Sequence, residues 1–179
     1  LASGDKHVPK WTKAADLTTM RVLLSGASGS LGTALSRRMR GGGDVLVGLD
    51  ILPRPVSWTG EYIQGSITDR LTVEGVMKQS IDAVVHIAAY HGVHERPVIE
   101  GQAAMDAHDF WNLNVNGTFQ MFEAAASAGV KRIVYISSTS IPREKYGLYG
   151  HTKILGEQIA STYANRHQMR VITLRPRGF

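Results

Sequence analysis

The sequence predicts a doubly wound α/β fold, in which helices cover both faces of a parallel sheet. Short runs rich in valine, isoleucine and leucine recur without alternating polar residues, which is typical of strands buried on both faces. Segments of helical periodicity lie between these runs, and that alternation indicates a parallel sheet. The 179 residues, 43% hydrophobic and 20% charged, are enough for one folded domain with a core.

The first half of the chain contains four of the expected strands and two helices. The strands are residues 20–25 (MRVLLS), 44–49 (DVLVGL), 62–65 (YIQG) and 81–88 (IDAVVHIA). Residues 31–39 carry apolar side chains at helical spacing and stop at the three glycines 41–43. Residues 69–79 form the second helix, because Asp69 is suited to cap its first turn.

The second half repeats the alternation after one loop. Residues 90–107, with four charges and two glycines, are expected to form that loop. A long helix follows at 109–128 and ends before Gly129, since glycine suits the left-handed conformation after a helix. The remaining elements are a strand, a helix and a strand, at 132–137, 149–166 and 170–174.

Composition excludes several classes of protein. No cysteine is present, so the fold has no disulfide and no thiolate metal site, and a cytoplasmic, reducing location is expected. No apolar run reaches the roughly 18 residues of a transmembrane helix. The net charge of +5 comes from scattered basic residues without interleaved aromatics, which disfavours a nucleic-acid partner. Residues 1–19 are polar and are expected to be an N-terminal extension to a domain at 20–179.

A glycine-rich stretch follows the first expected strand directly. Gly26, Gly29 and Gly32 open the first helix, where glycine lets a pyrophosphate approach and the helix N-terminus offers free N–H groups. Asp50 ends the next strand, 18 residues after Gly32, where a carboxylate binds an adenosine ribose and repels a 2′-phosphate. The sequence therefore predicts an NAD-binding Rossmann domain, with NAD favoured over NADP.

From residue 20 onward the chain resembles the short-chain dehydrogenase/reductase superfamily, most closely its extended branch, the NAD-dependent epimerase/dehydratase family. After the glycine loop, further motifs follow in family order: HIAA (86–89), NVNGT (114–118), YISS (135–138), Tyr149-x-x-x-Lys153 and LRP (174–176). The cofactor contacts predicted from the loop and this resemblance come from Gly26, Ser28, Gly29, Ser30, Leu31, Gly32, Asp50, Ser66, Ile67, Ile87, Ala88, Ala89, Asn114, Ser137, Tyr149, Lys153 and Pro176.

The resemblance also implies a catalytic set of Ser138, Tyr149 and Lys153. Tyr149 and Lys153 are four residues apart and so share a helix face. A nearby ammonium is expected to lower the pKa of Tyr149, so that the phenol exchanges a proton with a substrate hydroxyl. Ser138 binds the same oxygen, with Thr139 as the alternative. The implied reaction is hydride transfer at a secondary alcohol of a sugar or nucleotide sugar.

Three features depart from the family pattern. Ser66 stands where the family usually carries aspartate, only 11 residues lead from Ser138 to Tyr149, and the chain stops at Phe179. The family's C-terminal substrate-binding region is therefore expected to be missing or truncated here.

Other functions stay open. The family pattern fits an epimerase or dehydratase, a dehydrogenase of a uronate or another alcohol, and, given the departures, a non-catalytic NAD-binding sensor or interaction module. His86, His91 and His94 lack the spacing of a metal site. His86 is expected to pack in the core, and the loop of His91 and His94 to border the substrate. The resemblance implies a homodimer through the helices at 109–128 and 149–166.

Overall fold

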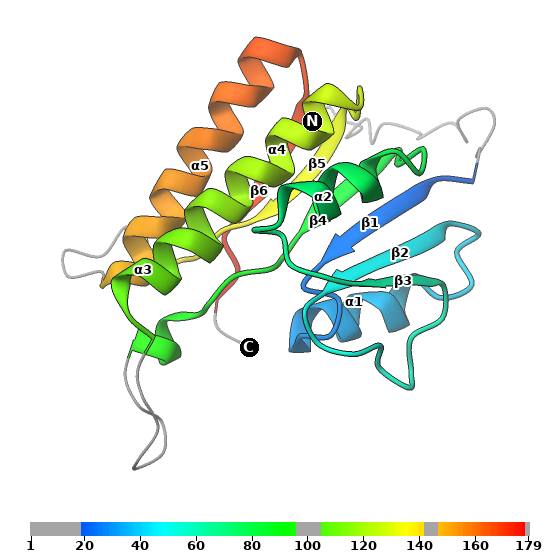
Figure 1. Cartoon of the computed structure of the whole chain (residues 1–179), viewed down its shortest axis with the longest axis horizontal. Coiled ribbons are helices and arrows are strands. Elements are labelled where there is room, and N and C mark those ends of the chain that lie inside the picture. The colour runs from blue at the N-terminus through cyan, green and yellow to red at the C-terminus, as the bar shows by residue number, and fades with distance from the viewer. Residues whose placement is uncertain (1–18, 96–104, 142–146, 178–179) are drawn as a thin grey trace, which may run out of the picture.

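A computed structural model describes residues 19–95, 105–141 and 147–177, so residues 1–18 of the expected extension lie outside it. Six parallel strands form one sheet in the order β3-β2-β1-β4-β5-β6 (Figure 1). The strands are β1 (Arg21–Ser25), β2 (Val45–Asp50), β3 (Glu61–Gln64), β4 (Ala83–His86), β5 (Arg132–Ile136) and β6 (Arg170–Leu174). The helical elements are α1 (Ser30–Met39), α2 (Arg70–Met77), the 3₁₀ turn η1 (Gly92–Glu95), α3 (Ala107–Phe110), the π-helix η2 (Trp111–Gly117), α4 (Thr118–Ser127) and α5 (Leu148–His167).

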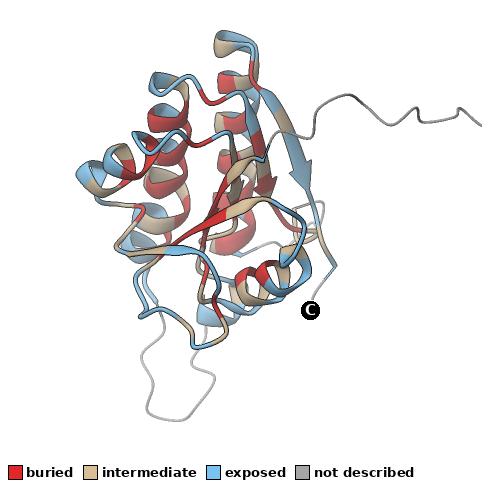
Figure 2. Ribbon diagram, turned by 90° about the vertical axis from the view of Figure 1, so that its right-hand side faces the viewer, coloured by how far each residue is buried: buried red, intermediate tan, exposed pale blue. Residues whose placement is uncertain are grey.

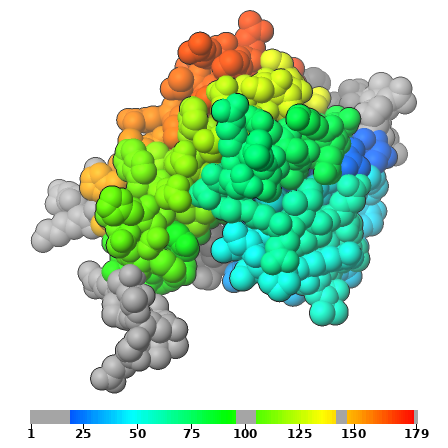
Figure 3. All heavy atoms as spheres, viewed as in Figure 1, coloured from blue at the N-terminus to red at the C-terminus, as the bar shows by residue number. Residues whose placement is uncertain are grey.

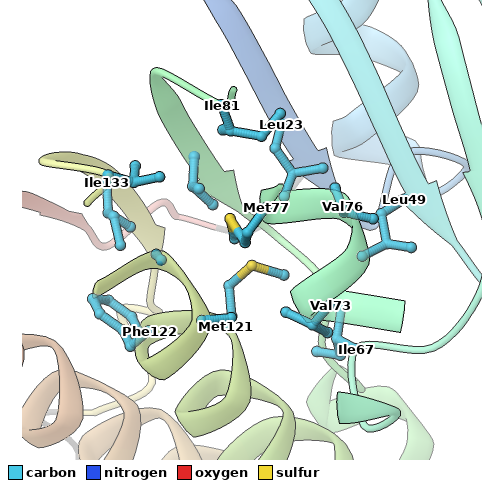
Figure 4. Packing of buried hydrophobic residues seen from close by; sticks show 14 of the residues in the cluster. Leu23, Leu49, Ile67, Val73, Val76, Met77, Ile81, Met121, Phe122 and Ile133 are labelled. Carbon is cyan, nitrogen blue, oxygen red and sulfur yellow. The ribbon is translucent and has the colours of Figure 1, made fainter. Parts of the chain in front are cut away.

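One face of the sheet is covered by α2, α4 and α5. Leu23 of β1 and Ile133 of β5 lie in the same apolar cluster as Met121 and Phe122 of α4 (Figure 4). The surfaces of α5, α4 and α2 adjoin one another in the upper part of Figure 3. Burial of these apolar side chains stabilises the layer, at about 25 cal/mol per Å² removed from water.

The opposite face carries α1. Val22 and Leu24 of β1 form a second apolar cluster, against which Leu35 and Met39 of α1 pack. Successive residues of β1 therefore point into different cores, which explains why this strand is apolar throughout. In Figure 2 the buried residues, in red, lie along the strands and on the helices that pack against them.

The strand order places a ligand crevice between β1 and β4. Chain connections run outward from β1 in one direction through β2 and β3, and in the other through β4, β5 and β6. Ser25 and His86 pair at the carboxyl ends of these neighbouring strands. In open α/β sheets, ligands bind beyond the carboxyl ends at such a reversal.

Most sequence predictions of the fold are confirmed. All six strands form, and Asp69 caps α2 by accepting a hydrogen bond of 3.1 Å from the Leu71 N–H. Gly41 and Gly129 have φ of +81° and +78° just after their helices. The predicted loop at 90–107 contains the turn η1, and residues 96–104 lie outside the description.

The long helix expected at 109–128 differs from its prediction. It starts at Ala107, because Asp106 and Asp109 form a capping box with reciprocal bonds of 2.9 and 3.2 Å. From Trp111 to Gly117 it is a π-helix rather than an α-helix.

The sheet is unevenly covered. Ile172 and Leu174 of the edge strand β6 are 58% and 46% exposed, on the side of the sheet where α1 lies against β1 to β3. Among the described residues no helix combines the length and apolar character needed to span a membrane.

Candidate functional site

The glycine loop is closely packed at the carboxyl end of β1. Gly26 has a φ of +73°, and a Cβ there would lie only 2.8 Å from the backbone nitrogen of Ala88. A Cβ on Gly32 would collide with the Gly26 carbonyl oxygen and lie 2.8 Å from the Cα of Ala27. The first and third glycines are therefore required by space.

The first turn of α1 is free of competing anions. Gly29 is the N-cap and supplies no side-chain cap, and no acidic residue stands in this turn. The first N–H groups of a helix have no partner within it, so those of Ser30 and Leu31 are available to an anion. The loop and this turn are therefore the candidate phosphate site.

Asp50 lies beside this candidate phosphate site at the end of β2. Its carboxylate accepts hydrogen bonds from the backbone N–H groups of Ser28 and Leu52, at 2.9 and 3.0 Å. Each carboxylate oxygen keeps acceptor capacity for a ribose hydroxyl. The nearby Arg54, whose direction the sequence left open, donates to the Trp58 carbonyl at 3.1 Å.

The hydroxyl of Ser28 is engaged within the protein. It lies 2.6 Å from the Tyr62 hydroxyl and 3.1 Å from the Pro53 carbonyl oxygen, which ties the glycine loop to the segment after β2. The Ser28 hydroxyl is therefore already hydrogen-bonded within the protein and is not free for the predicted cofactor contact.

Ser66 and Ile67 follow β3 at the same edge of the sheet. The Ser66 hydroxyl lies 2.8 Å from that of Thr68, and accepts the Thr68 N–H. The Ile67 side chain is 3% exposed and packs in the core against Gly117 of the π-helix. Only the backbone of Ile67 is thus left for the predicted cofactor contact.

The segment after β4 is fixed by a side chain of β1. The Ser25 hydroxyl accepts the N–H groups of Ile87 and Ala88, at 3.1 and 3.3 Å. Ala88 thereby lies against Gly26, and Ala89 is half-buried next to it. These three residues, predicted to line the cofactor, do adjoin the glycine loop.

His86 is buried, as predicted, but it is not an isolated core residue. Its Nδ1 lies 2.7 Å from the Ser25 Oγ and its Nε2 3.0 Å from the Thr118 Oγ1. Burial, together with the charge of Lys153, lowers the pKa of His86 to about 3. The ring is therefore neutral at physiological pH.

Asn114 joins the same segment to α5. Its Oδ1 accepts the Tyr90 N–H at 2.8 Å, and its Nδ2 donates to the Tyr90 carbonyl and to the Thr152 hydroxyl, both at 3.0 Å. Asn114 is 1% exposed and belongs to the π-helix, a form often found at functional sites. These three hydrogen bonds hold the segment after β4 against α5.

Tyr149 lies in the first turn of α5 and is mostly buried. Its ring packs against that of His91, with centroids 4.9 Å apart, and its N–H donates to Glu95 at 2.5 Å. His91 thus borders the predicted catalytic residue, and the Nδ1 of His94 accepts the His91 N–H at 2.9 Å. No three histidine, aspartate or glutamate side chains within the described ranges gather as a metal site would need.

The expected lowering of the Tyr149 pKa is wrong for this form of the site. Burial raises the pKa of Tyr149, and the hydrogen bond to Ser138 offsets this only in part. The sequence pattern implied a nearby ammonium, but it could not show how far η1 and α5 remove the phenol from water.

Lys153 is 3% exposed, and burial lowers its pKa to about 7, against the opposing effect of Glu157. Its Nζ lies 4.6 Å from the centroid of the Tyr135 ring. A lysine with this pKa exchanges its proton near neutral pH and is only partly charged there, so its effect on Tyr149 is weaker than that of an exposed ammonium.

Four other predicted residues lie just after β5 or β6: Ser137, Ser138, Thr139 and Pro176. The Ser137 hydroxyl donates to Glu157 at 2.6 Å, and the Thr139 hydroxyl donates to the Pro176 carbonyl at 3.3 Å. The Ser138 Oγ accepts the Ser140 N–H at 3.1 Å, and its hydroxyl also bonds the Tyr149 phenol. Ser138 thus fits the catalytic position better than Thr139.

The comparison with known families shows which family the chain belongs to. The model of the NAD dependent epimerase/dehydratase family matches residues 22–178. The chain belongs to the NAD-dependent epimerase/dehydratase family. It also lies within the wider short-chain dehydrogenase/reductase superfamily that the motifs predicted.

Individual members of the family agree with this assignment. A uronate dehydrogenase of Pseudomonas putida is 30% identical over 171 residues, which cover 87% of this chain and 59% of the relative. A UDP-glucose 4-epimerase of Lactobacillus helveticus is 30% identical over 159 residues, covering 78% and 46%. The chain thus spans about half the length of the relatives it matches.

A solved structure supports the fold. A short-chain dehydrogenase/reductase superfamily protein of Agrobacterium tumefaciens, with bound NAD, superposes with a TM-score of 0.73 at 27% identity. The match covers 87% of this chain and 48% of that one.

The residues of this chain fit a dinucleotide of the kind that the family uses. A cradle that a Cβ would fill at Gly26 or Gly32, a first helical turn without acid, and an acceptor at Asp50 lie side by side. The sequence did not single out Thr152, Glu157 or Glu95, which hold Asn114, Ser137 and Tyr149. The spacing of Glu157 from Lys153, one turn along α5, is the only signal that could have indicated one of them.

Proposed function

We propose that the protein is an NAD-dependent enzyme that oxidises a secondary alcohol of a sugar or nucleotide sugar by hydride transfer. The observation that carries this proposal is the convergence of Ser138, Tyr149 and Lys153 at the carboxyl end of β5. All three are buried, and two of them have shifted pKa values. Such shifts cluster at sites of proton transfer.

Each of the three side chains has a distinct task. Ser138 donates its hydroxyl proton to the reacting oxygen. Tyr149 first loses its own proton to solvent and then, as the phenolate, takes the proton that leaves the substrate alcohol. Lys153, with a pKa of about 7, stabilises that phenolate when its own side chain is charged. NAD, when bound, would supply the hydride acceptor for this oxidation.

Binding of the cofactor rests on the first half of the sheet. The glycine loop and the first turn of α1 receive the pyrophosphate, and Asp50 receives the adenosine ribose. The carboxylate of Asp50 opposes a 2′-phosphate, and this supports NAD over NADP.

The fate of the hydride separates the two reactions that the relatives represent. A dehydrogenase releases the oxidised sugar and accumulates NADH, whereas an epimerase returns the hydride and accumulates none. The test is to incubate the intact protein and NAD⁺ with a uronate or with UDP-glucose. NADH absorbance and sugar analysis are then followed together.

Tyr149→Phe is the decisive variant. We expect it to lower kcat by about 10²-fold or more, because the general base is lost, with NAD⁺ affinity unchanged. Tyr163→Phe, on the same helix but bonded to Glu123, is the matched control and should keep full turnover. Binding of NAD⁺ without turnover of any sugar would instead support a sensor or interaction module.

We further propose that two copies pair through the outer faces of α4 and α5. These helices enclose a groove of about 610 Å³, and Phe119, 41% exposed, lies on it. Its apolar lining includes Val115, Phe119, Leu155 and Ile159. Sedimentation of the wild type and of Phe119→Glu tests this: a dimer is expected for the first and a monomer for the second.

A further inference from the structure

A series of hydrogen-bonded, buried polar side chains lies beneath the site and takes no part in the proposed proton transfer. This series is called the hydrogen-bond chain. It passes from Ser25 at the end of β1 through His86 of β4 to Thr118, whose hydroxyl bonds the Asn114 carbonyl at 2.6 Å. All four residues are at most 1% exposed. Burying so many polar groups is costly unless each finds its partner.

The partners of Ser25 and Thr118 indicate the direction of their hydrogen bonds with His86. The single hydroxyl proton of Thr118 goes to the Asn114 carbonyl, so Thr118 can only accept from His86, and the Nε2 of His86 must carry a proton. The Nδ1 of a neutral ring is then an acceptor, and Ser25 donates to it. The Ser25 oxygen meanwhile accepts the N–H groups of Ile87 and Ala88.

A second proton on His86 has no place in this arrangement. An N–H at Nδ1 would need the Ser25 oxygen, which already accepts two backbone N–H groups, and would leave the Ser25 proton without an acceptor. The low pKa of His86, caused chiefly by burial, agrees with that geometry. The ring is held as the neutral Nε2–H tautomer.

The hydrogen-bond chain continues to the catalytic turn of α5. The side chain of Asn114 bonds both backbone groups of Tyr90 and donates to Thr152, and the Thr152 hydroxyl donates to the Tyr149 carbonyl at 2.8 Å. One end of the hydrogen-bond chain, at Ser25, therefore lies next to Gly26 in the candidate cofactor site. The other end lies at the backbone of the proposed general base.

We propose that His86 is a positioning residue, which sets the segment after β4 and the Tyr149 turn at a fixed place relative to the glycine loop. The linkage runs through Thr118, Asn114 and Thr152. This inference rests on the proposed function, because Tyr149 has to act on a substrate for its position to matter. The hydrogen-bond chain is uncharged throughout, so it acts through geometry and adds no field of its own.

The tautomer is tested without any turnover. In intact protein labelled with ¹⁵N-histidine, the His86 nitrogens should report a protonated Nε2 and a bare Nδ1, unchanged between about pH 5 and 8. A ring protonated at Nδ1, or one that titrates in this range, would overturn the inference while leaving the proposed function untouched.

The coupling to Tyr149 is tested by a matched pair at Thr118. Thr118→Val keeps the shape but removes the hydroxyl, whereas Thr118→Ser keeps the hydroxyl. For the valine variant we expect about tenfold lower kcat, with KM and NAD⁺ affinity within about twofold, and a shifted ¹³C resonance of the Tyr149 ring. The serine variant should restore both. Equal behaviour of the two variants in kcat and resonance contradicts the inference.

A second pair of variants, at Thr152, is used if the Thr118→Val protein does not fold. Thr152→Val against Thr152→Ser then gives the same comparison at the other end of the hydrogen-bond chain. If the wild type turns over no sugar, the proposed function fails, and the Tyr149 resonance in the NAD⁺-saturated variants alone decides the positioning role.

Discussion

The two halves of the sheet provide different kinds of chemical groups at the candidate cofactor site. Around β1 and β2 the site consists of backbone N–H groups, glycines without room for a Cβ, and one carboxylate. Around β4 and β5 it consists of buried side chains with shifted pKa values, such as His86 and Lys153. The first half thus depends on space, and the second on buried polar groups with defined protonation states. Substitutions in the two halves should therefore fail in different assays.

The largest effect is expected from Gly32→Ala, because the new Cβ collides with backbone that cannot move aside cheaply. We expect at least about 100-fold weaker NAD⁺ binding, roughly 2.7 kcal/mol, measured by calorimetry. Gly75→Ala is the control, since a Cβ on Gly75 in α2 meets nothing within 4 Å. Similar affinities of the two variants would contradict the role of space in this half.

Lys153→Met should stabilise the fold at neutral pH and below. Unfolded Lys153 keeps its proton up to about pH 10.5, whereas the folded side chain has a pKa of about 7, so stability rises with pH between these values. Below pH 7 the buried side chain is charged in the folded protein, and this lowers the free energy of unfolding by its full amount. By about pH 10.5 this loss of stability has disappeared. The methionine variant should therefore gain a few kcal/mol at about pH 6 and almost nothing at about pH 10.5.

Urea unfolding across this range measures the difference. Lys78→Met, at an exposed position just after α2, is the control and should show no such trend. A gain for Lys153→Met that does not depend on pH would mean that packing, not charge, decides it.

Asp50→Asn is expected to have a smaller effect, confined to the first half. The amide cannot accept from both Ser28 and Leu52, and it no longer repels a phosphate. NAD⁺ affinity should fall about tenfold, or about 1.4 kcal/mol, and the preference for NAD⁺ over NADP⁺ should narrow. Asp44→Asn, before the other end of β2, should leave both affinities unchanged.

Ser137→Ala should have the smallest effect. Its hydroxyl donates to Glu157, which two bonds from Arg175 still hold. We expect a loss of about 1 kcal/mol in unfolding free energy and no change in NAD⁺ affinity. A clear fall in affinity would show instead that Ser137 contacts the cofactor, as its motif predicted.

The sequence was most informative where the causes of structure are local. The strands and the cap at Asp69 depend on neighbouring residues, and each was predicted correctly. The catalytic role of Tyr149 and Lys153 stays a prediction from a short motif, whose two residues share one face of a helix.

What the sequence could not give depends on distant packing. The bonds between His86 and Thr118 join residues 32 positions apart, and no local pattern records them. The direction of the Tyr149 pKa shift depends on burial by a separate turn, η1. The π-helix was missed because apolar and buried residues four apart suit an α-helix equally well.

That π-helix has a consequence for how the gene can change. Phe110, Asn114, Thr118 and Phe122 are buried at every fourth position. In an α-helix each residue turns by about 100°, so steps of four would drift by about 40° each, and the wider turn of η2 absorbs part of this drift. Deleting one codon there would rotate Phe110 by about 100° relative to Asn114, and both could not stay buried. Within this segment a substitution should therefore be tolerated better than a deletion or an insertion.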